Sequence, residues 1–208
     1  YQSYSAFAGN PYFIDLDRLA EQGLLTQNDM LKFDWGKNPS CISYDKIAEH
    51  RLQLLQTAYE NSNHLYRSDY MEFCKKQEHW LDDYALFMAC KDHFGQCEWL
   101  KWNPDIKERD ASALMNYRIL LKEKIQFWKF CQYQFYQQWN DVKTYANEKE
   151  IYIIGDIPIY LALDSADVWT HPDLFLLDNE KQPKVVAGVP PDAFSDTGQL
   201  WGNPLYRW

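Results

Sequence analysis

Runs of positive charge are missing from this sequence. No stretch of Lys or Arg is longer than two residues, and the formal net charge of the 208-residue chain is −9. Binding to nucleic acids or to anionic membranes needs clustered positive charge. We therefore expect neither a nucleic-acid partner nor a membrane partner, whereas a neutral polymer is compatible with this charge balance.

Cysteine pairs at short spacing are also missing. The five cysteines are odd in number and form no C-x-x-C pair. This favours reduced thiols and a cytoplasmic location over a disulfide framework. Cys90, His93 and Cys97 lie close together in the sequence, but no second ligand pair stands at the spacing typical of a zinc site. We expect no metal and no organic cofactor.

Long apolar runs are missing as well, and we expect no leader segment. No apolar run approaches the roughly 18 residues needed to span a bilayer. The first residues are polar and aromatic, unlike those of a signal peptide. Because the chain begins at Tyr1 rather than at a methionine, we interpret it as a segment of a longer protein and expect any functional site to be incomplete.

The composition is that of a globular domain with many aromatic residues. Apolar residues make up 46% of the chain and charged residues 25%, which is ordinary, but aromatic residues reach 17%. Aromatic rings either fill a core or form platforms against the apolar faces of sugar rings. For any single Trp, core packing is the favoured interpretation.

Three zones follow one another along the chain. Residues 1–40 contain turn signals and a short helix that is expected to end near Gly23. Residues 41–150 show helical spacing, with breaks expected at 61–63 and at Gly95. Within this zone, residues 111–150 lack Pro and Gly and carry one apolar stripe, which predicts a single long helix packed on its neighbours.

The third zone, residues 151–208, changes its period. Ile151–Ile154 is a compact β-branched run and is typical of a buried parallel strand, with Asp156 at its C-terminal end. Residues 173–186 predict a β-hairpin around a polar turn at 178–182, and 188–191 predict an extended loop. A helix followed by a parallel strand is typical of α/β architecture, in which polar groups at the carboxyl ends of strands form active sites.

Several polar residues of this zone are candidates for chemistry. Asp156 is either a turn former or a carboxylate in a binding cleft, and its place after a strand keeps both interpretations open. Asp164 and Asp167 look like capping residues of a short helix. The segment 190–204 presents amides and rings that suit a saccharide, because amides pair with vicinal hydroxyls and rings stack on sugar C–H faces. Its composition also suits a protein interface; its candidate side chains are Phe194, Gln199, Trp201 and Asn203.

Several ordered motifs of the sequence closely resemble the 4-α-glucanotransferases of glycoside hydrolase family 77. They extend from one end of the chain to the other, which makes them more specific than any single pattern. They are Tyr1–Pro11, Gly155–Tyr160, Asp164–Trp169, Gly188–Asp192 and Thr197–Pro204.

The resemblance implies an α/β fold: a partial (β/α)8 TIM-type barrel with a large helical insertion, so that the chain itself is mainly α-helical. It divides the chain into a barrel segment with a substrate-side loop (1–40), a helical insertion (41–150), and a barrel strand with a hairpin and a glucan-contacting loop (151–208). It implies retaining transfer of α-1,4-glucan segments between maltodextrins, with maltooligosaccharides as partners. The residues that it places at the glucan are Tyr1, Asp156, Asp192, Phe194, Ser195, Gln199 and Trp201.

The groups that break the bond are expected elsewhere. The family's nucleophilic aspartate sits in an Arg-x-Asp-His motif, which this sequence lacks, and its acid/base glutamate also belongs further downstream. The isolated chain is therefore expected to contain no catalytic residue and to be inactive. Two alternatives stay open, an amylase-like hydrolase of α-glucans and a non-catalytic module for glucan binding or helical interaction.

Overall fold

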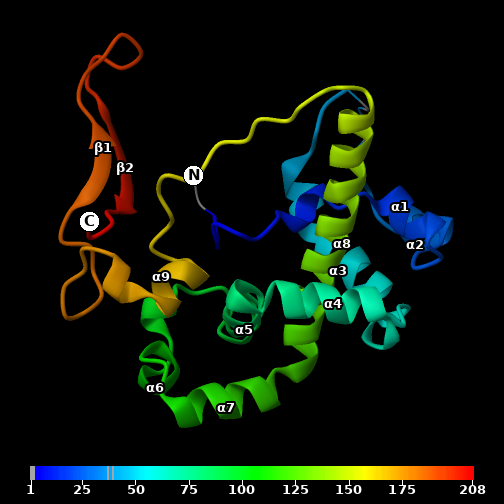
Figure 1. The fold of residues 1–208 in the computed structure, drawn as a ribbon, viewed down its shortest axis with the longest axis horizontal. Helices are drawn as coiled ribbons and strands as arrows, with labels where there is room; N and C mark the ends of the chain where they lie inside the picture. The colour runs from blue at the N-terminus through cyan, green and yellow to red at the C-terminus, as the bar shows by residue number, and fades with distance from the viewer. Residues whose placement is uncertain (1–2, 37, 39) are drawn as a thin grey trace. The chain divides into compact units, whose positions relative to one another are not determined.

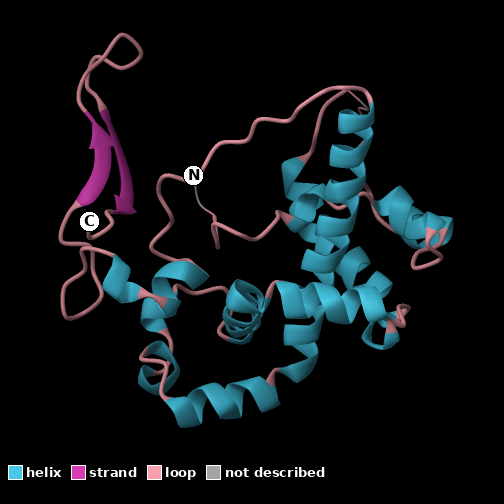
Figure 2. Ribbon diagram, in the orientation of Figure 1, coloured by secondary structure: helices cyan, strands magenta, loops and turns pink. Residues whose placement is uncertain are grey.

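The computed structural model describes residues 3–36, 38 and 40–208. The chain is mainly helical, and its one named sheet has two strands (Figure 1, Figure 2). The 3-10 helices are η1 (Pro11–Phe13), η2 (His64–Tyr66), η3 (Trp99–Lys101) and η4 (Pro172–Leu174). The α-helices are α1 (Leu16–Glu21), α2 (Gln27–Leu31), α3 (Tyr44–Glu60), α4 (Ser68–Lys76), α5 (Glu78–His93), α6 (Pro104–Lys107), α7 (Ala111–Leu120), α8 (Lys122–Glu148) and α9 (Ala166–Thr170). The strands are β1 (Val186–Val189) and β2 (Gln199–Pro204).

The chain divides into two compact units. The first unit comprises residues 1–8, 80–125 and 155–208, and the second comprises residues 9–79 and 126–154. Each unit is therefore built from segments that lie far apart in the sequence. The division at residues 40 and 150 that the sequence suggests stays a prediction.

The core of the first unit is built around tryptophans. The ring of Trp102 lies 5.5 Å from Trp169 and 5.3 Å from Phe87, measured between ring centroids. Trp99 is also buried, and its indole nitrogen donates to the carbonyl oxygen of Leu163 at 2.8 Å. Core packing, favoured for each Trp from the composition, is confirmed for these three, and the buried indole finds the partner that it needs.

The core of the second unit forms along α8. Tyr59 of α3 packs its ring 5.9 Å from Phe127 and 5.7 Å from Phe130. Gln132 is fully buried, and its side chain both accepts from the main-chain nitrogen of Gly9 (2.8 Å) and donates to its carbonyl oxygen (2.9 Å). A buried amide is stable only when such bonds satisfy it, so this pair holds the Gly9 turn against the helix.

Most predicted helix ends are confirmed. Helix α1 ends just before Gly23, whose φ of 74° is the left-handed conformation that favours glycine at a helix end. Helix α3 ends at Glu60, before the predicted break, and α5 ends at His93, before Gly95.

The single long helix predicted for 111–150 is wrong, because the structure has α7 and α8 in its place. The break is at Leu121, which still donates its N–H to the carbonyl of Tyr117 and accepts from the N–H of Ile125. The spacing of apolar residues thus continues through a break in the helix. Periodicity alone does not report such a break.

The buried strand predicted at Ile151–Ile154 is also not observed. Residues 151–159 form no strand and are exposed, Ile154 to 95%. A strand requires a neighbour that accepts and donates its ladder hydrogen bonds, and within the described part of the chain no segment takes that place. Apolar, β-branched composition cannot supply this partner by itself.

The hairpin predicted around 178–182 is confirmed in a short form. Leu177 and Pro183 form an isolated antiparallel bridge, and the main-chain nitrogen of Asp178 donates to the carbonyl of Gln182 at 2.8 Å. The oxygen Oδ1 of Asp178 also accepts from the main-chain nitrogens of Glu180 and Gln182 within the turn. The predicted first arm is partly helical, since it begins with η4.

Candidate functional site

The segment expected to be a loop from Gly188 onward is mostly a β-hairpin. Strands β1 and β2 run antiparallel, with Gly188 opposite Leu200 and Val189 opposite Gln199 (Figure 1). A Cβ at Gly188 would lie 2.7 Å from the carbonyl oxygen of Gln199, so only glycine lets the strands approach this closely. The extended course predicted for Gly188 and Val189 is therefore a strand.

The tip of this hairpin is shaped by hydrogen bonds within the loop. The oxygen Oδ1 of Asp192 accepts from the main-chain nitrogens of Phe194 (2.8 Å) and Ser195 (2.9 Å). The Ser195 hydroxyl donates to the carbonyl of Gly198 at 2.8 Å. Asp192 and Ser195 thus act on the loop itself, in the way that Asx turns do, and they present the ring of Phe194, which is 94% exposed.

Strand β2 carries an exposed tryptophan. Trp201 is 47% exposed, and its indole nitrogen donates to Oε1 of Gln199 at 3.0 Å. The ring of Tyr160 lies 5.9 Å from that of Trp201. The structure therefore orients the indole from two sides, through a neighbour on the same strand and through an aromatic ring from a distant segment. Such a held ring can serve as a platform for a flat apolar surface.

Asn203 has a different position from the other candidates. It is 9% exposed, and its Nδ2 donates to the carbonyl oxygen of Leu161 at 2.9 Å. The side chain thus joins β2 to the segment before α9. A buried amide with a main-chain partner is occupied, and this is the contact that the structure shows for the residue predicted to bind sugar.

Asp156 lies on the exposed stretch 151–159 and is itself exposed. Tyr160 and Leu161, which follow this stretch, contact β2. Asp156 precedes that contact in the sequence. Tyr1, the other residue that the resemblance places at the glucan, lies outside the described residues.

The short helix predicted to open at residues 164–167 is confirmed as α9, but neither aspartate is its N-cap. Ser165 is the N-cap of α9, with its hydroxyl accepting from the main-chain nitrogen of Val168 at 3.3 Å. Asp167 accepts from the main-chain nitrogen of Ala6 at 3.3 Å, and burial raises the pKa of its carboxyl while that bond and one from Ser5 oppose the shift. Asp164 instead pairs with the buried Lys91.

Two grooves occur in the second unit, apart from the candidate residues. One has a volume of about 560 Å³ and is lined by Phe13, Trp139 and Tyr145 among others. The second, of about 420 Å³, includes Trp35 and Arg51. Neither contains a residue that the sequence marked for glucan contact.

The described part of the chain carries neither a metal-binding cluster nor a membrane-spanning helix. Over residues 3–36, 38 and 40–208, no group of three or more His, Cys, Asp or Glu side chains is placed to hold a metal ion. No helix in the described ranges is both long enough and apolar enough to cross a membrane.

The sequence reasoning missed two residues of this region. Tyr160 was part of a quoted motif but was not singled out as the aromatic neighbour of Trp201. Lys91, outside the candidate site, gave a signal that could have been used, because it directly follows the apolar run Ala85–Cys90 of α5, and a charged residue that continues a buried run needs a partner.

Comparison with known proteins gives a consistent result. The family model described as 4-alpha-glucanotransferase matches residues 1–208. The 4-alpha-glucanotransferase of Clostridium butyricum is 51% identical over the whole chain, and that of Thermus thermophilus is 44% identical. These matches cover 43% and 41% of the two relatives, so the chain spans about two fifths of their length.

Solved structures resemble the chain in the same way. An amylomaltase from Streptococcus agalactiae, solved in complex with acarbose, superposes with a TM-score of 0.92 at 44% identity and covers 100% of this chain and 42% of its own. An amylomaltase from Corynebacterium glutamicum, at 16% identity and a TM-score of 0.71, shares the fold. With a family model that matches its whole length, the chain belongs to the 4-alpha-glucanotransferases, glycoside hydrolase family 77.

Proposed function

We propose that the protein to which this chain belongs is a 4-α-glucanotransferase, which transfers α-1,4-glucan segments between maltodextrins with retention of configuration. The observation that carries the proposal is the family match over residues 1–208. The exposed aromatic groups on the hairpin of β1 and β2 support it, because Phe194 and Trp201 offer ring faces to a sugar chain.

The reaction needs two carboxyl groups that this chain does not supply. In retaining enzymes these groups stand roughly 5–5.5 Å apart on either side of the scissile bond. One attacks the anomeric carbon and forms a glucosyl ester while the other protonates the leaving oxygen. The second group then takes the proton of the acceptor hydroxyl, which displaces the ester. We assign both roles to residues of the complete protein that lie downstream of this chain.

Within the chain we assign four side chains to the glucan. Trp201 and Phe194 stack on sugar rings, and Gln199 and Asp156 bind hydroxyl groups. Asp192 and Ser195 shape the loop that presents Phe194, and Asn203 holds β2 in place. Tyr1 is proposed as a further aromatic contact.

We further propose that the exposed apolar residues of the chain belong to an incomplete barrel. Ile153 and Ile154 are 42% and 95% exposed, and Val142 and Tyr145 of α8 are 56% and 65% exposed. We propose that other segments of the complete protein cover these side chains. In the complete enzyme, neighbouring strands pair with 151–154 and complete a (β/α)8 barrel. A cytoplasmic location is proposed because the cysteines are odd in number and form no C-x-x-C pair.

The activity is tested with maltotriose as the only substrate. The complete enzyme is expected to produce glucose together with oligosaccharides longer than maltotriose, because a sugar hydroxyl outcompetes water for the ester. Formation of only glucose and maltose would favour the amylase-like alternative, and no turnover would favour the non-catalytic module. The 208-residue chain alone is expected to release no product, and disproportionation by it would overturn the placement of the catalytic groups.

The binding residues are tested by substitution in the complete enzyme. Trp201→Ala and Asp156→Asn are each expected to weaken maltooligosaccharide binding about tenfold, in line with the loss of a stacking or hydrogen-bonding contact. Tyr66→Ala, at an aromatic that is 87% exposed in the second unit, and Asp173→Asn, at an exposed carboxylate, are the matched controls. Unchanged binding in both site variants would refute the assignment.

A further inference from the structure

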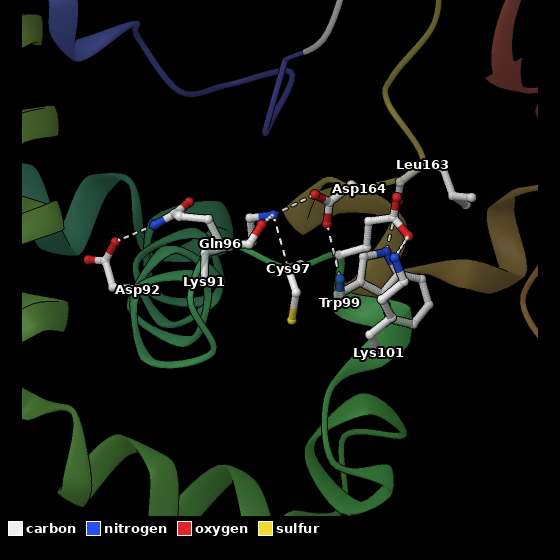
Figure 3. Close-up of polar contacts among 9 residues, drawn as sticks. Lys91, Asp92, Gln96, Cys97, Trp99, Lys101, Leu163 and Asp164 are labelled. Atoms are coloured by element: carbon white, nitrogen blue, oxygen red, sulfur yellow. Dashed lines mark hydrogen bonds and ion pairs between the residues drawn. The ribbon is translucent and has the colours of Figure 1, made fainter. Parts of the chain in front are cut away.

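A buried lysine outside the candidate site contacts the segment that leads into it. Lys91 of α5 is 2% exposed, and its Nζ lies 2.6 Å from Oδ2 of Asp164 (Figure 3). The same nitrogen donates to the carbonyl oxygens of Gln96 at 3.0 Å and Cys97 at 3.1 Å. An ammonium group has three protons, and these three acceptors match them. The charge is therefore buried with its hydrogen bonds complete, the condition under which such burial is tolerated.

The partner carboxylate extends the connection. The second oxygen of Asp164, Oδ1, accepts from the main-chain nitrogen of Trp99 at 3.1 Å. The indole of Trp99 donates to the carbonyl of Leu163 at 2.8 Å, so two consecutive residues are held against η3 (Figure 3). Trp99 is 1% exposed, so its contacts with Leu163 and Asp164 lie in the close-packed interior and not at the surface.

The same short stretch, residues 160–164, also holds the candidate site. Leu161 accepts the side-chain bond of Asn203, and Tyr160 packs beside Trp201. Asp156 lies just upstream on the same segment. We call residues 160–164 the anchor segment. Lys91 and Trp99 bond to its C-terminal end, and Asn203 of β2 bonds to Leu161 near its N-terminal end. A shift of the anchor segment would move Trp201 and Asp156.

We propose that Lys91, through its ion pair with Asp164, is a positioning residue for the glucan-binding side chains Asp156 and Trp201. This inference rests on the proposed function. Replacing a buried ion pair by apolar residues of similar size is often neutral or stabilising. If Lys91 and Asp164 only filled space, an apolar pair would therefore serve equally well. What an apolar pair cannot reproduce is the directed bonding that fixes residues 163–164 to residues 96–99.

The test is a double substitution, Lys91→Met with Asp164→Leu, in the complete enzyme acting on maltotriose. Removing both charges avoids the unpaired, partly buried carboxylate that Lys91→Met alone would leave, since the side chain of Asp164 is 27% exposed. We expect unfolding to stay cooperative, with a midpoint lowered less than in Lys91→Met, and a KM raised about tenfold, because misplaced contacts weaken glucan binding. The single variant Lys91→Met is expected to unfold at a clearly lower temperature.

The matched control is Lys101→Met. Lys101 belongs to the same region and pairs with Glu98 at 3.3 Å, but both side chains are exposed, to 68% and 58%. Exposed pairs contribute little, so KM is expected to stay within about twofold of the wild-type value.

Three results would overturn the proposal. The first is a double variant with wild-type KM and kcat. The second is a double variant in which only kcat falls, since loss of folded enzyme scales the rate and leaves KM unchanged. The third is a double variant without a cooperative unfolding transition, which would make the pair a requirement of folding. Failure of the wild-type enzyme to lengthen maltotriose would instead refute the proposed function. This result is obtained from the wild-type enzyme alone, so it is distinct from failure of the Lys91 proposal.

Discussion

Asn203 donates a hydrogen bond from Nδ2 to the carbonyl oxygen of Leu161, 42 positions earlier in the sequence, at 2.9 Å. This bond attaches the strand that carries Trp201 to the segment that follows Asp156. It joins the two segments that carry the candidate residues. Asn203 therefore has a structural role, and its effect on glucan binding is expected to be indirect.

Loss of this bond is expected to destabilise the complete protein. Asn203→Ala leaves the carbonyl of Leu161 buried without its partner, at a cost of about 1–3 kcal/mol in the free energy of unfolding. The measurement is denaturant unfolding of the complete protein. Asn179→Ala, at an exposed position in the turn after Asp178, should stay within about 0.5 kcal/mol of the wild type. Equal effects of the two substitutions would contradict the anchoring role.

Gly198 is expected to tolerate no side chain. Its φ is 74°, and an added Cβ would lie 2.6 Å from the carbonyl oxygen of Val189. Gly198→Ala should therefore destabilise the hairpin by about 1–3 kcal/mol, through both backbone strain and this contact. Gly155→Ala is the control for unfolding, because a Cβ there meets no atom within 4 Å. Hydrogen exchange at the amides of β2 reports the local effect, and unchanged protection in Gly198→Ala would refute it.

The stability of the second unit is expected to fall below neutral pH because of His64. This residue is 3% exposed among the rings of Tyr59, Tyr70 and Phe130, and its Nε2 has no hydrogen-bond partner. Burial lowers the pKa of His64 below its usual value. The unfolded chain therefore takes up the proton first, so the full stability is present above a pH of about 6.5 and is lost as the pH falls below it.

The measurement is urea unfolding of the complete protein between pH 5 and pH 8. His64→Phe keeps a ring in the aromatic cluster and removes the proton, so the dependence on pH should become shallower by up to about 1.4 kcal/mol per pH unit. The wild-type protein, measured over the same pH range, is the reference for this slope. A His64→Phe variant with an unchanged slope would contradict the prediction.

The cysteines are expected to differ sharply in reactivity. Cys41 is exposed, whereas Cys90 and Cys131 are buried. Burial raises the pKa of the Cys90 thiol to about 12, so hardly any reactive thiolate exists at pH 8. Brief treatment of the folded protein with iodoacetamide should modify Cys41 and leave Cys90 and Cys131 unmodified, as measured by peptide mass spectrometry. Early modification of Cys90 would show that α5 opens on that timescale.

Local sequence signals predicted the helical part of this fold well. Gly23, Gly95 and the break after Glu60 each end a helix as expected, because glycine and asparagine act on the backbone within a turn or two. The helix break at Leu121 was missed because apolar spacing continues through it. The strand expected at Ile151–Ile154 was wrong for a related reason: pairing requires a partner strand, and a partner is not a property of the segment.

The candidate site was predicted in part. Motifs located the segment 188–204 and its rings Phe194 and Trp201, because these residues lie close together in sequence, but they predicted a loop where the structure has the paired strands β1 and β2. Asp192 and Ser195 were placed correctly in the loop, where the structure shows them bonding to its main chain. Tyr160 was missed because the two segments that meet there are separated by a long stretch of chain.

The sequence by itself determined the family, the helical middle, the polar turn at residues 178–182 and the charge that disfavours nucleic-acid and membrane partners. These follow from composition, from spacing over a few residues and from ordered motifs. Only the tertiary structure decided that Asn203 holds Leu161 and that Lys91 pairs with Asp164, 73 positions away. The physical reason is that buried polar groups must find partners wherever the fold brings them, and local spacing carries no record of those distances.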